Sequence, residues 1–137
     1  MIRMMHRQLL NFTLVGGIGF VVDAGVLTAL TALWGWDVYL ARLLSFVLAT
    51  LATWWLNRMR TFALPAGGPL AAHVGEYARY VSVQVGGGLI NLAVFSALIL
   101  LEPRLRPLPV LPLAVGSGVA LFWNYFGARL WVYRVQR

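Results

Sequence analysis

Four long apolar runs dominate the chain, and short segments rich in polar residues, proline or glycine separate them. Each run is close to the length of about 20 residues that an α-helix needs to cross the hydrocarbon core of a bilayer. The runs cover residues 12–33, 38–56, 80–101 and 110–130. We therefore predict an all-α membrane protein with four transmembrane helices.

The connections between the runs predict two helical hairpins in tandem. Only WGWD separates the first two runs, which is a tight turn carrying Gly35. The last two are separated by EPRLRPLP, where Pro107 and Pro109 forbid a continuous helix. The segment 57–79 contains two prolines and several glycines, so we expect one flexible polar loop there. Residues 1–137 then form a single membrane domain.

The second hairpin resembles the first. An offset of 68 residues aligns the first helices and places Asp23 on Asn91, and an offset of 71 aligns the second helices and places Arg58 on Arg129. Chance alignment of apolar segments is the alternative to a duplication. We predict a parallel internal repeat, whose halves are related by an axis along the membrane normal. The repeat units extend over residues of about 12–62 and about 80–133.

Composition excludes a soluble globular protein. The chain has 137 residues, 61% of them hydrophobic and 11% charged, with a mean hydropathy of +0.78, whereas soluble domains have roughly 25% charged residues. It contains no cysteine, and its two histidines lie far apart. It also carries no Ser-His-acid set, paired carboxylates or phosphate-binding loop. We expect a protein that is not an enzyme and uses no metal or cofactor.

The net charge of +7 comes with eleven arginines and no lysine. Such a charge suggests nucleic acid in a soluble protein, but here the arginines are distributed relative to the bilayer, so we expect no nucleic-acid partner. Eight arginines lie at the chain ends and in the central loop, and three lie at or near the hairpin tips. Because positive charge stays in the cytoplasm, both termini are predicted there. The eight are Arg3, Arg7, Arg58, Arg60, Arg79, Arg129, Arg134 and Arg137, and the three are Arg42, Arg104 and Arg106.

Polar residues inside the predicted spans are candidates for function. Asp23 lies about 17 Å into a hydrocarbon core of about 30 Å, where a carboxylate costs at least ~2.5 kcal/mol on insertion scales. It should face the helix bundle, either as a functional group or in a structural hydrogen bond. Asn91 occupies the equivalent position, and Gln84 lies two turns away from it. Together these side chains could line a hydrophilic cavity.

Arginines at the helix ends predict an anion site. Arg58 and Arg129 lie at the expected cytoplasmic ends of the second and fourth helices, with Asn57 and Asn124 nearby. Guanidinium groups bind phosphate in a bidentate way. The alternative for either arginine is an anchor whose charge reaches the membrane surface.

Arg42 lies about four residues inside the opposite end of the second helix. Its side chain either provides a second binding position for an anion or extends inward towards Asp23. The two residues differ in depth by about 9 Å along the helices, which makes a direct ion pair difficult.

Small residues four apart allow transmembrane helices to approach closely. Ser45 and Ala49 form one such stripe, and Gly116 and Ala120 form another. Because four helices make a thin wall around any cavity, we predict a homo-oligomer, most simply a dimer.

The segments VGGIGFVVDAGVL and ARLLSFVLATLATWWLNRMRTF, with GGGLINLAVF and NYFGARLWVY in the second half, resemble the GtrA-like family of small four-helix membrane proteins. The resemblance covers residues of about 12–133. It implies flipping of a polyprenyl-phosphate-linked sugar, such as undecaprenyl-phosphate glucose, across the inner membrane for cell-envelope polysaccharides. On this interpretation the phosphate is bound by Arg58, Arg129 and Arg42, and the sugar path is lined by Asp23, Asn91, Asn57, Asn124 and Gln84.

Two features depart from a simple repeat and leave the sugar undetermined: the TWW segment of the first half, and Arg42. Two other functions remain open. The protein could be a membrane anchor or assembly partner of a polyprenyl-phosphate glycosyltransferase. It could also be a small proton-coupled exporter using Asp23, although an excess of arginine repels cationic cargo.

Overall fold

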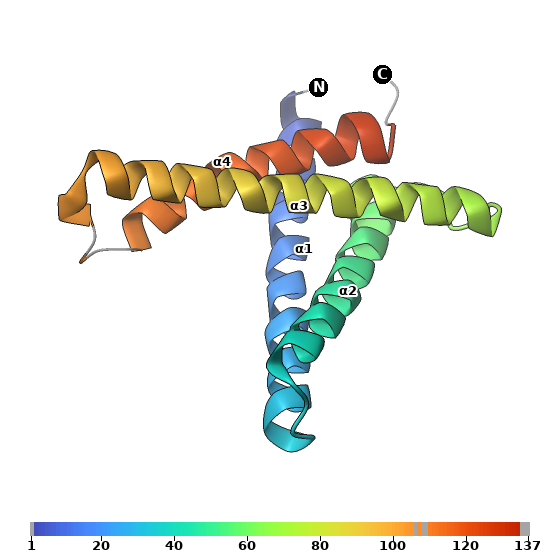
Figure 1. The fold of residues 1–137 in the computed structure, drawn as a ribbon. Coiled ribbons are helices and arrows are strands. Elements are labelled where there is room, and N and C mark those ends of the chain that lie inside the picture. The colour runs from blue at the N-terminus through green and yellow to red at the C-terminus, as the bar shows by residue number, and fades with distance from the viewer. Residues whose placement is uncertain (1, 106, 108–109, 135–137) are drawn as a thin grey trace. The chain divides into compact units, whose positions relative to one another are not determined.

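The computed structural model describes residues 2–105, 107 and 110–134, and these residues form helices and connections without any strand (Figure 1). Within them, four helices are long and apolar enough to cross a membrane. The predicted all-α membrane fold is therefore confirmed. Arg106, Pro109 and Arg137, which contributed to the expected turn and orientation, lie outside the described residues.

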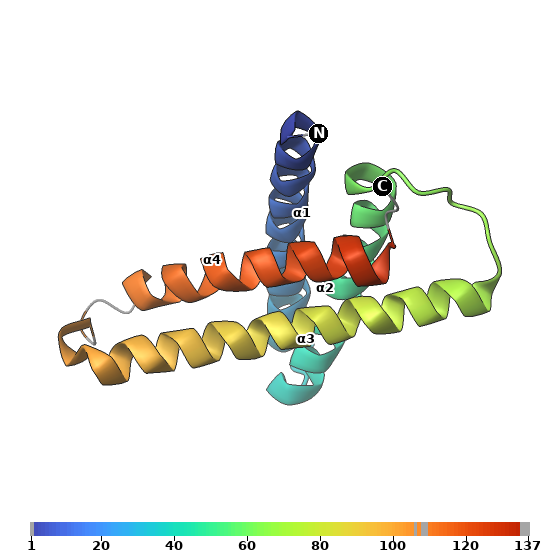
Figure 2. The ribbon, with the colours of Figure 1, turned by 90° about the horizontal axis from the view of Figure 1, so that it is seen from above.

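The first hairpin consists of α1 (Ile2–Thr28), the π-helical turn η1 (Ala29–Leu33), α2 (Val38–Leu56) and the π-helical turn η2 (Asn57–Thr61). Helices α1 and α2 pack along each other in opposite directions (Figures 1 and 2). Gly35 forms the predicted tight turn with φ +64°. Asp37 then starts α2, because its side chain accepts the N–H groups of Tyr39 at 3.0 Å and Leu40 at 3.1 Å.

The second hairpin consists of α3 (Leu70–Leu101), the 3-10 turn η3 (Pro103–Leu105), α4 (Val110–Gly127) and the π-helical turn η4 (Ala128–Val132). Helices α3 and α4 also pack along each other (Figure 2). The chain divides into two compact units, Met1–Pro69 and Leu70–Arg137, each containing one hairpin.

Two helices begin earlier than the apolar runs predict. Helix α1 begins at Ile2 instead of near residue 12, and α3 begins at Leu70, directly after Pro69, instead of near residue 80. The prediction of one flexible loop over 57–79 is therefore wrong. Hydropathy marks the part of a helix that lies in lipid, whereas the Met, Leu, Ala, Arg and Gln residues in these extensions favour helix in water as well.

The two hairpins share local features at the positions that the sequence offsets align. Phe12 and Phe62 are buried, with ring centroids 6.5 Å apart, and the aligned Tyr80 and Tyr133 are buried with centroids 6.2 Å apart. The π-helical turns η2 and η4 also occupy aligned segments. A duplication would leave such features, but the repeat and the cytoplasmic placement of both termini stay predictions.

Left-handed residues close both of these π-helical ends. After η2, the N–H of Phe62 donates to the carbonyl of Asn57 at 2.9 Å, and Ala63 then has φ +52°. After η4, Tyr133 donates to Ala128 at 2.9 Å, and the next residue has φ +46°. Only glycine adopts this conformation without a steric penalty, so Ala63 is strained.

We expect the Ala63→Gly substitution to stabilise the protein by about 0.5–1 kcal/mol, because relief of a left-handed penalty of about 1–2 kcal/mol exceeds the added entropy of the unfolded chain. SDS titration followed by circular dichroism measures this change. Ala66→Gly in the same connection is the control, since Ala66 does not have positive φ. Equal destabilisation by both substitutions would contradict the prediction.

The small-residue stripes are used inside the hairpins. Ser45 is fully buried and bonds to Asp23 of α1, and Gly116 lies against Asn91 of α3. Ala49 and Ala120 are buried as well. At Ser45 and Gly116 the close approach occurs between helices of one hairpin, so dimerisation stays a prediction that these two residues do not support.

Candidate functional site

An ionic cluster lies between the two helices of the first hairpin. Arg42 Nη1 donates to Asp23 Oδ2, and Ser45 Oγ lies 2.7 Å from Asp23 Oδ1 and donates to it. Ser45 Oγ is also 3.0 Å from the carbonyl oxygen of Arg42. Arg42 and Ser45 are one turn apart on α2, so both approach the single carboxylate on α1 from the same side. Both carboxylate oxygens of Asp23 therefore have a donor.

This geometry shows that Arg42 reaches Asp23, the second of the two alternatives for this residue. The residue lies about 6 Å along α2 from its first residue, and Asp23 lies about 15 Å from the end of η1 at the same turn. The arginine side chain spans the difference in depth, so the direct pair that the helical rise makes difficult does form. The side chain of Arg42 is 54% exposed and that of Asp23 is 20% exposed. The cluster is thus accessible from the Arg42 side.

Ser45 was predicted from the sequence only as a small residue, and its hydroxyl was missed as a partner of Asp23. The register of the hairpin contains the missing signal. Asp23 lies twelve residues before Gly35 and Ser45 lies ten residues after it. Residues at similar distances from a tight turn face each other in an antiparallel hairpin. The register therefore predicts Ser45 as a donor to Asp23.

In the second hairpin, the polar side chains form neutral contacts. Asn124 Nδ2 donates to Gln84 Oε1 at 3.1 Å, and Asn91 Nδ2 donates to Ser117 Oγ at 3.4 Å. Asn91 and Gln84 therefore both face α4, as two positions seven residues apart on one helix should. Ser117 was not identified from the sequence.

Each asparagine of this hairpin packs its carboxamide oxygen against a glycine of the opposite helix. Asn91 Oδ1 lies over Gly116, and Asn124 Oδ1 lies over Gly87. Both oxygens are buried, and neither has a hydrogen-bond partner within the described part of the chain. A buried acceptor without a partner costs about 1–3 kcal/mol. Each oxygen therefore has unused hydrogen-bonding capacity, and the opposite helix covers it in this structure.

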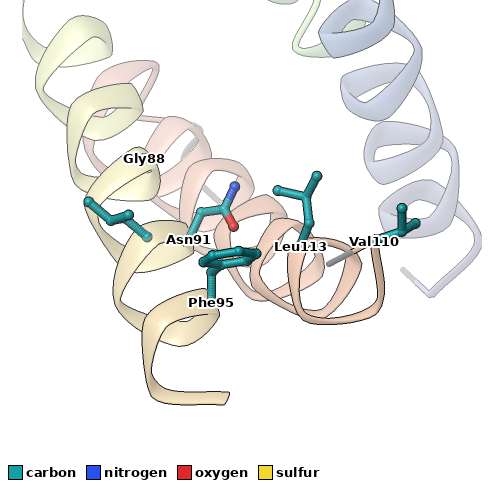
Figure 3. Close-up of a pocket in the computed structure, with 6 residues that line it drawn as sticks. Gly88, Asn91, Phe95, Val110 and Leu113 are labelled. Carbon is teal, nitrogen blue, oxygen red and sulfur yellow. The ribbon is translucent and has the colours of Figure 1, made fainter. Parts of the chain in front are cut away.

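A hollow of about 410 Å³ lies beside Asn91 between α3 and α4. Figure 3 shows that Asn91, Phe95 and Leu113 point towards this space. Its lining is Gly88, Asn91, Leu92, Phe95, Val110 and Leu113. Asn91 is the one polar residue in that set, so the hollow is an apolar space with a single polar contact, which differs from the hydrophilic cavity expected from the sequence.

The arginine at the end of the first hairpin is buried and bonded to the backbone. Arg58 is only 8% exposed, and its Nη2 donates to the carbonyl of Pro65 at 2.6 Å. Beside it, Asn57 is 1% exposed and accepts the Thr61 hydroxyl at 2.8 Å. These contacts hold the connection after η2 against the helix end. Arg58 and Asn57 therefore stabilise the fold, whether or not they also contact a ligand.

The corresponding arginine of the second hairpin is more accessible. Arg129 is partly buried, and its Nη1 lies 3.1 Å from the hydroxyl oxygen of Tyr125, one turn earlier on the helix. The aligned positions thus hold two guanidinium groups with different surroundings. Arg129 is the better position at which to test ligand binding, because its side chain is less buried than that of Arg58.

Asp37 and Glu102 have separate structural partners. Asp37 caps α2, and Glu102 lies 4.0 Å from the side chain of Arg104. Among the residues that the structure describes, no three His, Asp or Glu side chains converge in a way that could hold a metal ion.

Residues 11–133, nearly the whole chain, match the family model described as GtrA/DPMS, transmembrane domain. The match reaches into both hairpins and includes every candidate site residue discussed above. It extends over the segments on which the resemblance to the GtrA-like family was based.

Proposed function

The chain belongs to the GtrA/DPMS transmembrane domain family, and from this premise we propose that it flips a polyprenyl-phosphate-linked monosaccharide across the cytoplasmic membrane. Family membership supports the coarser statement, a multi-pass membrane protein associated with polyprenyl-phosphate sugars. The observation that carries the flipping proposal is a polar set within the spans of this family member. In the first hairpin this set is the ionic cluster at Asp23. In the second it is the contact of Asn91 with Ser117 and that of Asn124 with Gln84.

The phosphate contacts in this proposal come from Arg58 and Arg129, at the helix ends where the cytoplasm is expected from the arginine distribution. Arg58 lies beside Asn57 at the end of the first hairpin, and Arg129 follows Asn124 in the second. Charge-assisted hydrogen bonds to phosphate are short, strong and often bidentate with arginine. Positive charge on this side of both hairpins would collect the anionic lipid from the cytoplasmic leaflet.

The sugar contacts come from neutral amides. Asn91 lines the hollow between α3 and α4, and its carboxamide is a neutral hydrogen-bonding group of the kind that sugar hydroxyls bind. Gln84 and Asn124 extend the polar positions towards the other end of the hairpin. The polyprenyl tail stays in the bilayer throughout, so only the sugar and one charged group need protein contacts. With the cytoplasm negative, outward movement of one anion is favoured by ~2.3 kcal/mol per 100 mV.

The proposal includes four further features: a chain that is not an enzyme, an inner-membrane location, both termini in the cytoplasm and a homo-oligomer, most simply a dimer. Transport that is driven by the membrane potential needs no chemical reaction, so the chain need not be an enzyme. A dimer would enclose the polar residues more completely than two hairpins alone. A cytoplasmic C-terminus agrees with the eight arginines predicted on that side.

Reconstitution tests the proposal directly. Purified protein is placed in liposomes with a radiolabelled farnesyl-phosphate glucose, and a membrane-impermeant periodate reagent reports the glucose in the outer leaflet. We expect exchange between leaflets to accelerate at least tenfold over protein-free liposomes. Exchange at the protein-free rate, with protein that retains its helical content and binds the lipid, would contradict flipping.

A second candidate, a docking partner of a glycosyltransferase, is favoured by one feature. Helix α3 has 32 residues, which is about 48 Å against a hydrocarbon core of about 30 Å. Its first turns, with Glu76 and Arg79, therefore extend beyond the apolar run. Co-purification of a polyprenyl-phosphate glycosyltransferase, combined with exchange at the background rate, would favour docking. The exporter alternative is disfavoured because the only carboxylate deep in a predicted span is paired with Arg42.

A further inference from the structure

Arg42 points in an unusual direction for a membrane arginine. The residue lies within about 6 Å of the start of α2, close to the turn end of the first hairpin. Arginines so placed normally extend towards the nearby interface, where water and lipid phosphates solvate the charge. Arg42 extends deeper instead and bonds to Asp23. The carboxylate therefore holds the guanidinium away from the phosphates of the near leaflet.

The pair has room for a second anion. Asp23 occupies Nη1 of Arg42, whereas the arginine side chain as a whole is 54% exposed. Carboxylate and phosphate present the same kind of oxygen pair to the planar guanidinium fork. Asp23 also keeps a second donor in Ser45, at 2.7 Å. The carboxylate thus retains one hydrogen bond when Arg42 turns towards another anion.

We propose that Asp23 is a resident anion that competes with the phosphate of the transported lipid for Arg42. This inference rests on the proposed function and assigns Asp23 to phosphate release, in place of the sugar contact expected from the sequence. A phosphate arriving at the turn end pairs with Arg42, and Asp23 remains with Ser45. The like charge of Asp23 disfavours this state. Return of Arg42 to Asp23 then releases the phosphate into the leaflet at the turn end.

The second hairpin lacks this arrangement. The sequence offsets align Asn91 with Asp23 and Leu113 with Arg42, and both aligned residues are neutral. The exchange of anions is therefore a property of the first hairpin alone. In this proposal the first hairpin uses the charged pair of Asp23 and Arg42 for the phosphate, and the second uses the neutral amide of Asn91 for the sugar.

Binding of farnesyl phosphate to nanodisc-embedded protein tests the competition. Asp23→Asn keeps the shape of the side chain and removes the competing charge, so we expect affinity to rise about tenfold. Arg42→Gln should lower affinity about tenfold. In the double variant affinity should stay within about twofold of that of Arg42→Gln, because the competition for the guanidinium is gone and only the weaker direct repulsion by Asp23 has been removed. Despite tighter binding, Asp23→Asn should flip the lipid at least fivefold more slowly, since release is impaired.

Matched controls isolate the phosphate contact. Arg104→Gln removes an arginine from the connection between α3 and α4, where it is exposed beside Glu102, and should change affinity less than twofold. Farnesol should bind all variants equally, because it has the tail without the phosphate. Inorganic phosphate should show the same ranking of variants with weaker affinity, which separates the headgroup contribution from the tail. A ranking that holds for inorganic phosphate but not for farnesyl phosphate would overturn a lipid site.

A purely structural ion pair predicts different results. In that case Asp23→Asn and Arg42→Gln would lower affinity and thermal stability alike, and the exchanged pair, Asp23→Arg with Arg42→Asp, would restore both. That outcome overturns the inference. If Asp23→Asn unfolds, Arg42→Lys gives an independent test: the charge remains but the fork is lost, so affinity should fall about threefold, and unchanged affinity contradicts the proposal.

The two proposals can fail separately. If wild-type protein flips the lipid but Asp23→Asn binds farnesyl phosphate as wild type does, the competition is wrong and flipping stands. If wild-type protein neither binds nor flips the lipid, the proposed function is wrong and the competition falls with it.

Discussion

Arg129→Ala is expected to weaken binding of a polyprenyl-phosphate sugar about ten- to a hundredfold, because a charge-assisted contact to phosphate contributes roughly 1.5–3 kcal/mol. Arg129 is partly buried and donates to Tyr125, so its guanidinium is held in one orientation before the ligand arrives. Titration of nanodisc-embedded protein with farnesyl-phosphate glucose measures the loss. Flipping at low lipid concentration should fall by a similar factor.

Two variants accompany that measurement. Arg129→Lys should recover only part of the affinity, since lysine keeps the charge but loses the planar fork. Arg60→Ala removes an exposed arginine from η2, at the end of the first hairpin, and should change affinity less than twofold. Equal effects of Arg129→Ala and Arg60→Ala would indicate general surface charge instead of a phosphate site.

Gly116→Ala is expected to destabilise the protein by about 1–3 kcal/mol, the usual cost of adding a methyl group to a tightly packed contact. A β-carbon at Gly116 would lie 2.8 Å from the backbone oxygen of Asn91 and would overlap its carboxamide. Because one obstacle is backbone, a change of rotamer cannot relieve the clash. The midpoint of SDS-induced unfolding should therefore move to lower SDS.

Gly118→Ala is the matched control on the same helix. A β-carbon there meets nothing within 4 Å, and alanine favours helix over glycine by about 0.8–1 kcal/mol. We expect no destabilisation. If both alanine variants unfold at the same SDS concentration, the close contact between Gly116 and Asn91 does not form in the membrane.

The membrane spans could be predicted from hydropathy alone, but the helix ends could not. Lipid imposes a strong signal, because an unbroken stretch of about twenty apolar residues is rare outside a membrane span. Outside lipid that signal stops while the helix continues, as Leu70 and Ile2 show. The strained conformation of Ala63 was equally hidden, since alanine gives no sign that its backbone is left-handed.

Individual polar residues could be singled out from the sequence, but their contacts could not. Asp23 stood out because a carboxylate in a membrane span is expensive. Its partners depended on side-chain reach and hairpin register, which the helical rise alone does not give. Arg58 illustrates the same limit: its position suggested an anion site, whereas its hydrogen bond to Pro65 follows from how the chain turns after η2.

The ion pair at Asp23 also bears on how the protein enters the membrane during synthesis. A lone aspartate near a helix centre adds about 2.5–3.5 kcal/mol to insertion, and an arginine nearer a helix end adds less. Asp23 and Arg42 are 19 residues apart in the chain and joined by one tight turn, so pairing can neutralise both as soon as α2 emerges. We expect α1 and α2 to leave the translocon together as one hairpin. Helices α3 and α4 have neutral residues at both aligned positions and do not require this coupling.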